Sequence, residues 1–221
     1  ERLMATHWDN RAIICDVLGR APDVEMGSIG EGWSLCRWRQ FVGSYALPPL
    51  PDPMFIVHIS GKPQIKTWDR DGWSQSSSIP GCATIQPSGM PSGWLVDGEL
   101  DAVTLSVSSD LLKNISATEQ FSKLRFAFAD PLGVALTRQI LSELYAPDAD
   151  EREHYVAAMV NALKAHILAG PPAHGPPLGP QRHRGPHGDA ARLHRGRRQP
   201  DRHGGDGPQR RPHRRELSRG L

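Results

Sequence analysis

The pattern of hydrophobic and polar positions changes its period once along the chain, near residue 108. Before that point, apolar and polar side chains roughly alternate within short segments, and turn sequences rich in Gly and Pro separate these segments. Such alternation predicts β-strands, and many short strands joined by turns indicate an antiparallel barrel or sandwich. The predicted strand segments are 33–42, 54–60, 64–68, 73–79, a short strand within 80–94, and two strands around Asp97-Gly98 within 94–108.

Further along the chain the apolar positions take helical spacing. Residues 109–115 predict a short helix. A longer helix is predicted over 130–146, with Asp130 as its N-cap and Pro131 at the first helical position. A second long helix is predicted over 148–169, with acidic residues in its first turn. Strands followed by helices indicate an α+β fold, here an antiparallel β-barrel followed by a pair of α-helices.

The composition changes abruptly near Gly170. Residues 171–221 contain 12 Arg, 9 Pro and 9 Gly, but no Ile, Val, Met, Phe, Tyr or Trp. A segment with so little to bury cannot form a packed core, so a disordered C-terminal tail is predicted. The predicted organisation is an N-terminal arm, a β-barrel, a helical segment and this tail, over residues 1–30, 31–116, 117–170 and 171–221.

The charge divides at the same place. The tail has twelve Arg against four acidic residues and carries about +8, so the rest of the chain carries about −6 to reach the net charge of +2. Such an asymmetry can mark a contact with nucleic acid. Three hypotheses therefore stand for the tail: a nucleic-acid-binding tail, a disordered linker, or a segment that is not the natural continuation of this protein.

The cysteines and the hydropathy indicate the compartment. Cys15, Cys36 and Cys82 are an odd, widely spaced set without a CxxC pair, which favours reduced structural thiols over a zinc site or a disulfide framework. No apolar run approaches the roughly 18 residues that a membrane-spanning helix needs. A cytoplasmic protein without a membrane partner is therefore predicted.

The turn residues that precede the last predicted strands carry a family resemblance. Pro80-Gly81 predicts a tight turn into a strand, Pro87 and Gly89 predict the turn that leaves it, and Trp94 follows. With its flanking strands and helices, this layout resembles the cupin-like N-terminal sensor domain of AraC-family transcriptional regulators over roughly residues 45–168. The resemblance implies a cupin-like barrel that binds a small-molecule effector, and a homodimer to which the second long helix contributes.

The apolar stripe of that second helix has two interpretations. Its spacing suits a seam between two copies of the chain, as the resemblance implies, and it equally suits packing against the chain's own barrel. The candidate dimer-interface residues are Val156, Met159, Leu163 and Ile167.

A barrel can also hold a small ligand in its mouth. Trp38, His58 and Trp94 are the candidate ligand-binding residues, because each combines a large surface with one polar group. The same three residue types are also common in packed cores, so core packing is the alternative interpretation for each of them.

Many enzymatic cupins bind a metal through a pair of His, a Glu and a later His, and this chain departs from that pattern. No HxH motif occurs before the tail, and Pro91, Ser92 and Gly93 stand where the last ligand would fall. A metal needs several ligands that converge on one point. Motifs of the GxSxG, P-loop or HExxH type are also missing. We therefore expect no metal, no cofactor and no catalytic residue, and we do not expect an enzyme.

AraC-family regulators carry two helix-turn-helix units after the sensor, and this sequence has no counterpart to them. Residues 171–221 lack the apolar stripes that such helices need for their bundles. The resemblance thus implies DNA as a partner of an intact regulator, whereas sequence-specific DNA binding is not expected of this chain.

A shifted reading frame accounts for the composition of the tail. Codons can be chosen for residues 192–203, RLHRGRRQPDRH, so that the frame one nucleotide later encodes DYIEAAANLTV. That hypothetical product is similar to the segment that leads into the first helix-turn-helix of the family. A frame-shifted or lost DNA-binding half and a natural disordered tail both stay open as explanations.

Two other functions also stay open. One is a small cupin enzyme, metal-dependent or metal-independent, which bound iron, zinc or manganese would favour. The other is a barrel whose Arg-rich tail binds nucleic acid without sequence preference, with an affinity that falls steeply with salt. A tail-deleted chain that binds DNA as well as the full-length chain would exclude it.

Overall fold

The computed structural model describes residues 9–26, 29–69, 71–115, 119–146 and 152–170. All of them belong to one compact unit, Glu1–Gln181. The predicted tail, 171–221, lies outside the described residues.

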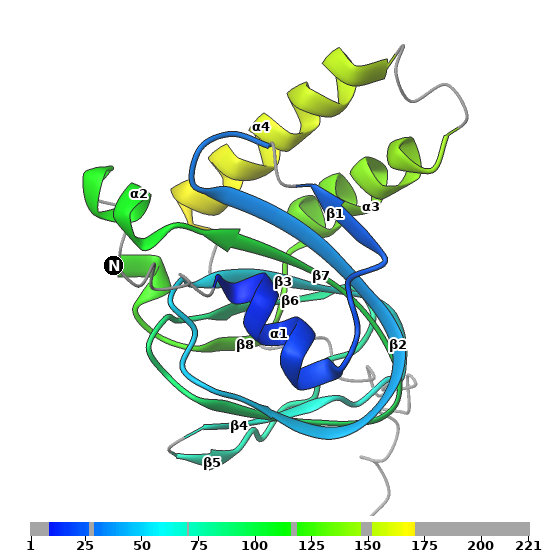
Figure 1. Cartoon of the computed structure of the whole chain (residues 1–221), viewed down its shortest axis with the longest axis vertical. Coiled ribbons are helices and arrows are strands. Elements are labelled where there is room, and N and C mark those ends of the chain that lie inside the picture. Colours follow the sequence, from blue (N-terminus) through cyan, green and yellow to red (C-terminus); the bar gives the residue numbers. More distant parts are fainter. Residues whose placement is uncertain (1–8, 27–28, 70, 116–118, 147–151, 171–221) are drawn as a thin grey trace, which may run out of the picture. The chain divides into compact units, whose positions relative to one another are not determined.

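The elements follow one another along the chain as strands first and long helices last, after one short N-terminal helix (Figure 1). In chain order they are α1 (Asn10–Leu18), β1 (Val24–Met26), β2 (Trp33–Leu47), β3 (Met54–Gly61), β4 (Lys66–Asp69), β5 (Gly72–Trp73), β6 (Cys82–Gln86), β7 (Ser92–Val107), α2 (Ser109–Asn114), the 3-10 turn Glu119–Phe121, β8 (Arg125–Ala129), α3 (Pro131–Leu144) and α4 (Glu153–Ala169).

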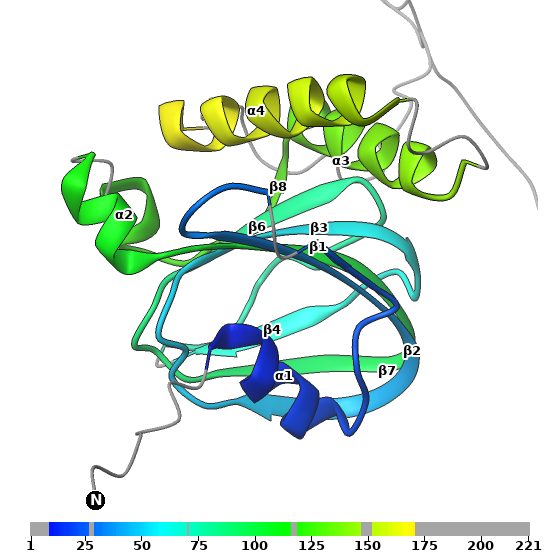
Figure 2. The ribbon, with the colours of Figure 1, turned by 45° about the horizontal axis from the view of Figure 1, so that its top comes forward.

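The strands form one antiparallel sheet that folds over on itself. Its main order is β1-β2-β7-β3-β6-β8, with β4 paired to both β7 and β5. The two long strands, β2 and β7, pair along almost their whole length. β7 pairs with β3 through its C-terminal half and with β4 through its N-terminal half. The long strands therefore curve from one layer of the barrel into the other, as Figure 2 shows.

The α+β class and the antiparallel strands followed by a pair of helices are confirmed, with two differences. Residues 117–170 were predicted to be helical, but they include the strand β8, which pairs with β6. The two strands predicted around Asp97-Gly98 are one continuous strand, β7. Asp97 adopts a positive φ of 50°, and the opposing strand β2 shifts its register between Val42 and Ser44, so the irregularity is absorbed without a turn.

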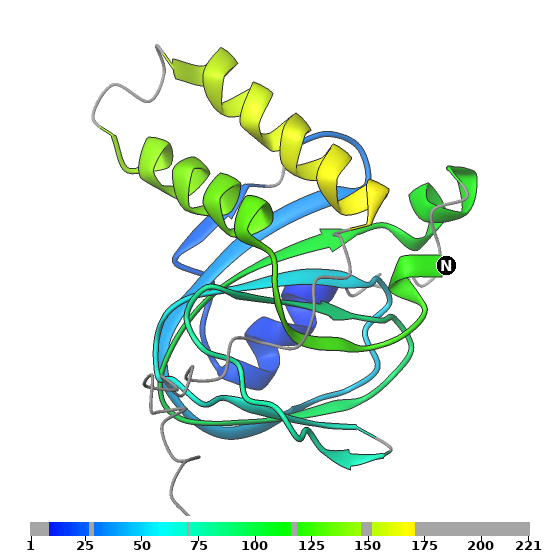
Figure 3. The same cartoon turned by 180° about the vertical axis from the view of Figure 1, so that it is seen from behind.

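Two apolar cores lie on opposite sides of the sheet. The first, the sheet–helix core, lies between one face of the sheet and the helices α3 and α4, which run side by side over that face in Figures 2 and 3. The second, the barrel core, lies inside the folded sheet and includes residues of α1. Four residues of the sheet–helix core are Leu35, Phe55, Ile85 and Leu105, and four of the barrel core are Trp38, Met54, Trp94 and Leu100.

The start of α3 forms as its sequence predicts. Asp130 is the N-cap, Pro131 occupies the first turn, and Asp130 Oδ1 accepts a hydrogen bond of 3.0 Å from the backbone N–H of Gly133. Gly133 has to be glycine here, because a Cβ would lie 2.6 Å from Asp130 Oδ2. His166 Nε2 of α4 lies 2.8 Å from Asp130 Oδ1, so the buried carboxylate also joins the two helices.

The stripe on α4 lies inside the sheet–helix core. Its four residues are at most 8% exposed within a single chain. The stripe was open to two interpretations, a seam between two copies or packing against the chain's own barrel. These side chains pack against the chain's own sheet, because side chains buried this deeply have no surface left for a second copy. An interface on α4 would have to use its outward side. The four buried residues are Val156, Met159, Leu163 and Ile167.

Candidate functional site

The three predicted ligand-binding residues come together in one cavity inside the barrel. Trp38 on β2, His58 on β3 and Trp94 on β7 all line it. They are far apart in sequence, and the pairing of β7 with both β2 and β3 brings them to the same interior. Inward-facing residues of each strand alternate with residues of the opposite face, which is why each of these strands contributes several side chains to the cavity.

The cavity is enclosed mostly by apolar side chains. Of its fifteen lining residues none is Asp, Glu, Lys or Arg, and four are His, Ser or Thr. The centre of a water molecule can move through about 50 Å³ of this space. At roughly 10–15 Å³ for one water, this is room for a few water molecules.

Helix α1 contributes to the cavity, although the N-terminal arm was not predicted to be part of the site. Ile14 and Leu18 of α1 line the cavity, and α1 lies at the opening of the barrel in Figure 1. Local signals for this helix exist in the sequence. The side chain of Asp9 accepts a hydrogen bond of 2.8 Å from Ala12 N as the N-cap, and Gly19 ends the helix in the left-handed conformation.

Both indole N–H groups in the cavity already have protein partners. Trp38 Nε1 donates to Thr104 Oγ1 at 3.0 Å, and Trp94 Nε1 donates to Ser92 Oγ at 3.1 Å. The Trp94 ring stacks against Tyr45, with the ring centroids 6.5 Å apart. The two tryptophans therefore offer the cavity their ring surfaces, and their polar groups are not free for a ligand.

His58 differs from the tryptophans. Its side chain is 4% exposed, and its Nδ1 lies 3.1 Å from Ser78 Oγ. Its Nε2 is buried and has no hydrogen-bond partner. A buried polar atom without a partner costs free energy, so such an atom in a cavity is a candidate point for a ligand.

The environment of His58 favours the neutral imidazole. Burial lowers its pKa, while the backbone of Ser60 and the charge of Asp101 act in the opposite direction and offset only part of the effect. The lining thus presents a neutral ring and no charged group to the interior.

A network that the sequence did not predict lies on the outer side of the same strands. Arg37 Nε and Nη2 donate to the two oxygens of Asp101, at 2.9 and 3.0 Å, and Ser60 Oγ donates to Asp101 Oδ2 at 2.5 Å. Burial raises the pKa of Asp101, but the hydrogen bonds from Arg37 and Ser60 outweigh it and the pKa is lowered. Arg37 Nη1 also donates to the hydroxyl of Tyr145 at 3.1 Å.

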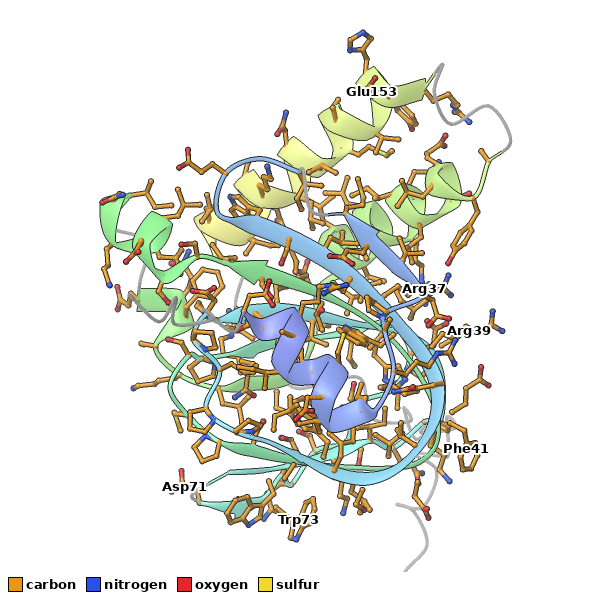
Figure 4. All side chains as sticks on the ribbon, viewed as in Figure 1. Arg37, Arg39, Phe41, Asp71, Trp73 and Glu153 are labelled. Atoms are coloured by element: carbon orange, nitrogen blue, oxygen red, sulfur yellow. The ribbon has the colours of Figure 1, made fainter. Side chains whose placement is uncertain are left out.

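This network ties the barrel wall to the end of α3. Asp101 is 1% exposed and lies between two cavity residues in sequence, Leu100 and Ala102. Arg37 lies on β2 between β1 and β7, and Figure 4 shows it near Arg39. Two charged residues 64 positions apart carry no local signal, so only the pairing of β2 with β7 reveals the contact.

The structure also bears on metal binding, on the cysteines and on membrane-spanning helices. Within the described ranges, no group of three or more His, Cys, Asp and Glu side chains gathers in a way that would hold a metal ion. Cys15, Cys36 and Cys82 are free thiols, and burial raises the pKa of Cys36 to about 12. Among the helices described, none is long and apolar enough to cross a membrane.

No family model matches the sequence, and no curated protein matches it significantly. Among solved structures the chain is similar to the AraC-like transcriptional activator CuxR, with 13% identity, a TM-score of 0.43, and coverage of 70% of this chain and 56% of that one. It is also similar to ToxT from Vibrio cholerae, with 8% identity, a TM-score of 0.39, and coverage of 63% and 57%.

A cupin domain from Bordetella pertussis is similar over a shorter region, with 14% identity, a TM-score of 0.27, and coverage of 39% of this chain and 93% of that one. The chain thus spans little more than half of the length of the CuxR and ToxT structures.

Proposed function

We propose that the barrel is the small-molecule-sensing domain of a transcriptional regulator of the AraC type. The observation that carries this proposal is the cavity inside the barrel in which the buried His58 Nε2 has no partner. Stability alone would favour filling such a space with apolar side chains, so a cavity with an unpaired polar atom supports binding. The layout of turns, strands and helices adds the resemblance to AraC-family sensors.

The proposed role is binding without chemical turnover. An effector in the barrel would change the relative stability of conformations of the domain, and an intact regulator would transmit that change to its DNA-binding units. The Arg37–Asp101–Ser60 network supports such coupling, since it connects strands that line the cavity with Tyr145 at the end of α3. A regulator of this kind would work in the cytoplasm.

Filling the cavity tests the binding role. Ala102 lines the cavity, so Ala102→Leu should fill part of it, whereas Ala135→Leu places the same side chain on the exposed side of α3. Thermal unfolding is measured with a panel of neutral and charged compounds of up to about ten heavy atoms. We expect at least one compound to raise the Tm of the wild type and of A135L but not of A102L. A panel that raises no Tm, or a hit that A102L retains, would contradict the proposal.

We also propose that two copies associate through the outer side of the helix pair. The exposed apolar side chains of Leu132 on α3 and Tyr155 on α4 support this surface. Sedimentation equilibrium should give a dimer that Tyr155→Glu weakens at least tenfold. Phe41→Ser, which changes an exposed aromatic side chain on the barrel, should leave the dimer unchanged. A monomer at all concentrations would refute this part without affecting the binding role.

A further inference from the structure

We propose that the ligand of the barrel is a small, uncharged aromatic molecule with one hydroxyl group, a phenol in its chemical class, and that its hydroxyl pairs with His58 Nε2. This proposal rests on the proposed binding role and specifies the ligand for the same cavity. Three properties of the lining lead to it: an unpaired buried ring nitrogen, the lack of charge, and the aromatic walls.

Most of the polar atoms in the lining already have a partner within the protein. The indole N–H groups of Trp38 and Trp94 are paired within the protein. Thr84 Oγ1 accepts a hydrogen bond of 3.1 Å from Ala127 N, and Thr104 Oγ1 accepts from Trp38. Among the buried side-chain atoms of the lining, His58 Nε2 is the one without a partner.

A hydroxyl suits this atom better than a pure donor or a pure acceptor. His58 Nδ1 is in contact with Ser78 Oγ, and a serine hydroxyl can either donate or accept. Nε2 is therefore an acceptor in one tautomer and a donor in the other. A hydroxyl group on the ligand satisfies Nε2 in both cases, whereas a carbonyl or an ether oxygen satisfies it in only one.

The ligand has to be uncharged because nothing in the lining would compensate a charge. No Lys, Arg, Asp or Glu lines the cavity. Burial lowers the pKa of His58, so this ring offers no cation to a carboxylate or phosphate at neutral pH. Asp101 is engaged by Arg37 and Ser60 on the other side of the strands. A buried ion without a partner is strongly disfavoured, which excludes anions and cations alike.

The aromatic residues of the lining favour a ligand with a ring. Trp38, Tyr45 and Trp94 line it, and Tyr45 stacks on Trp94 with an angle of 16° between the rings. Aromatic walls of this kind provide stacking and edge contacts to another ring. The small volume limits the ligand to at most one ring.

Three probes of similar size separate these properties: p-cresol has the ring and the hydroxyl, toluene has only the ring, and benzoate has the ring and a charge. Isothermal titration of the full 221-residue chain at pH 7.5 gives the three affinities. We expect p-cresol to bind at least tenfold more tightly than toluene, because only p-cresol pairs with Nε2. We expect benzoate to bind at least tenfold more weakly than p-cresol.

The variant His58→Leu removes the polar atom. In H58L the preference for p-cresol over toluene should fall to less than threefold, while the exposed His154→Leu on α4 keeps the wild-type preference. The wild type provides a second readout that needs no variant. In ¹⁵N NMR spectra of the histidine rings, p-cresol should shift the Nε2 resonance of His58, and toluene should shift it much less.

The outcomes separate this proposal from the binding role. If toluene or benzoate binds as tightly as p-cresol, or if p-cresol leaves the Nε2 resonance unmoved, the ligand class is wrong although the cavity binds small molecules. An H58L variant that keeps the full preference for p-cresol would also overturn it. If the barrel binds none of the probes and no compound of the wider panel, the proposed function fails as well.

Discussion

The sheet–helix core and the barrel core are formed by opposite faces of the same strands, yet they differ in character. On β3, Phe55 and Val57 face the sheet–helix core, whereas Met54 and His58 belong to the barrel side. On β7, Leu105 likewise faces α3 and α4, and its neighbour Thr104 faces the cavity. The first face is covered by aliphatic and aromatic side chains, whereas the second places hydroxyl groups and an imidazole among its apolar side chains around a cavity.

Polar groups are treated differently in the two cores as well. Asp130, at the edge of the sheet–helix core, is 2% exposed and pairs with Gly133 N and His166 Nε2. His58, in the barrel, is buried to a similar degree and leaves Nε2 unpaired. Folding stability favours the arrangement around Asp130 and disfavours the one around His58, which agrees with the proposed binding role of the barrel side.

The largest difference in the free energy of unfolding should appear when a leucine is changed to alanine in each of the two cores. Leu35 is buried at 1% in the sheet–helix core, and Leu100 lines the cavity of the barrel core. We expect Leu35→Ala to lower the free energy of unfolding by about 4 kcal/mol and Leu100→Ala by about 2 kcal/mol, because Leu100 already lacks neighbours on its cavity side. Urea denaturation measures both, and equal losses would show that the cores are packed alike.

A smaller difference in stability should appear between variants of the two aspartates that cap helices. Asp130→Ala removes the cap of α3 and leaves His166 without its partner, so we expect a loss of about 2 kcal/mol. Asp9→Ala removes only the exposed cap of α1 at the barrel opening and should cost about 1 kcal/mol. Thermal unfolding monitored by circular dichroism gives both values. A cost of Asp130→Ala no larger than that of Asp9→Ala would argue against the role of the His166 contact.

Removing the unpaired polar group should raise the free energy of unfolding, whereas the changes above lower it. In the double variant H58L/S78A both partners of the buried contact become apolar, so we expect the free energy of unfolding to rise by up to about 1 kcal/mol. Met54→Leu, a swap of similar volume in the same barrel core, serves as the control and should change stability by less than about 1 kcal/mol. Destabilisation of the double variant well beyond that of the control would mean that His58 is a structural residue.

The smallest effect concerns pH. Because burial lowers the pKa of His58, the unfolded chain takes up a proton near its ordinary value of about 6.5 while the folded chain does not. The free energy of unfolding is therefore unaffected by this proton above that pH and falls as the pH drops from about 6.5 towards the lowered pKa. Urea denaturation at pH 7.5, 6.5 and 5.5 should show a steeper loss for the wild type than for H58L, by at most about 1.4 kcal/mol per pH unit. Parallel curves would contradict a neutral buried His58.

Local patterns predicted a large part of the fold. The alternation along 54–60 reflects two faces that are both covered, and the cap at Asp130 starts α3 where it was expected. The strand β8 was missed because Arg125–Ala129 is short and lies in a segment whose neighbours have helical spacing. It forms because β6 offers it an antiparallel edge, which is a long-range interaction.

The sequence predicted which residues belong to the candidate site, but not how they are arranged. Trp38, His58 and Trp94 were chosen for the chemistry of their side chains, and the structure places all three in one cavity. Which polar groups are free could not be predicted, because Thr104, the partner of the Trp38 indole, is 66 positions away and reaches it only after β2 and β7 pair. The α4 stripe likewise suited two interpretations until its burial against the sheet was known.

By itself, the sequence determined the α+β class, the cap of α3 and the residue types available inside the barrel, because each of these depends on periodicity or on neighbours within a few positions. Only the tertiary structure decided that the sheet folds over, that α1 joins the lining, and that His58 Nε2 is left without a partner. These features depend on pairing between strands that are distant along the chain. That pairing determines which side of each strand is filled by helices and which side encloses a space for a ligand.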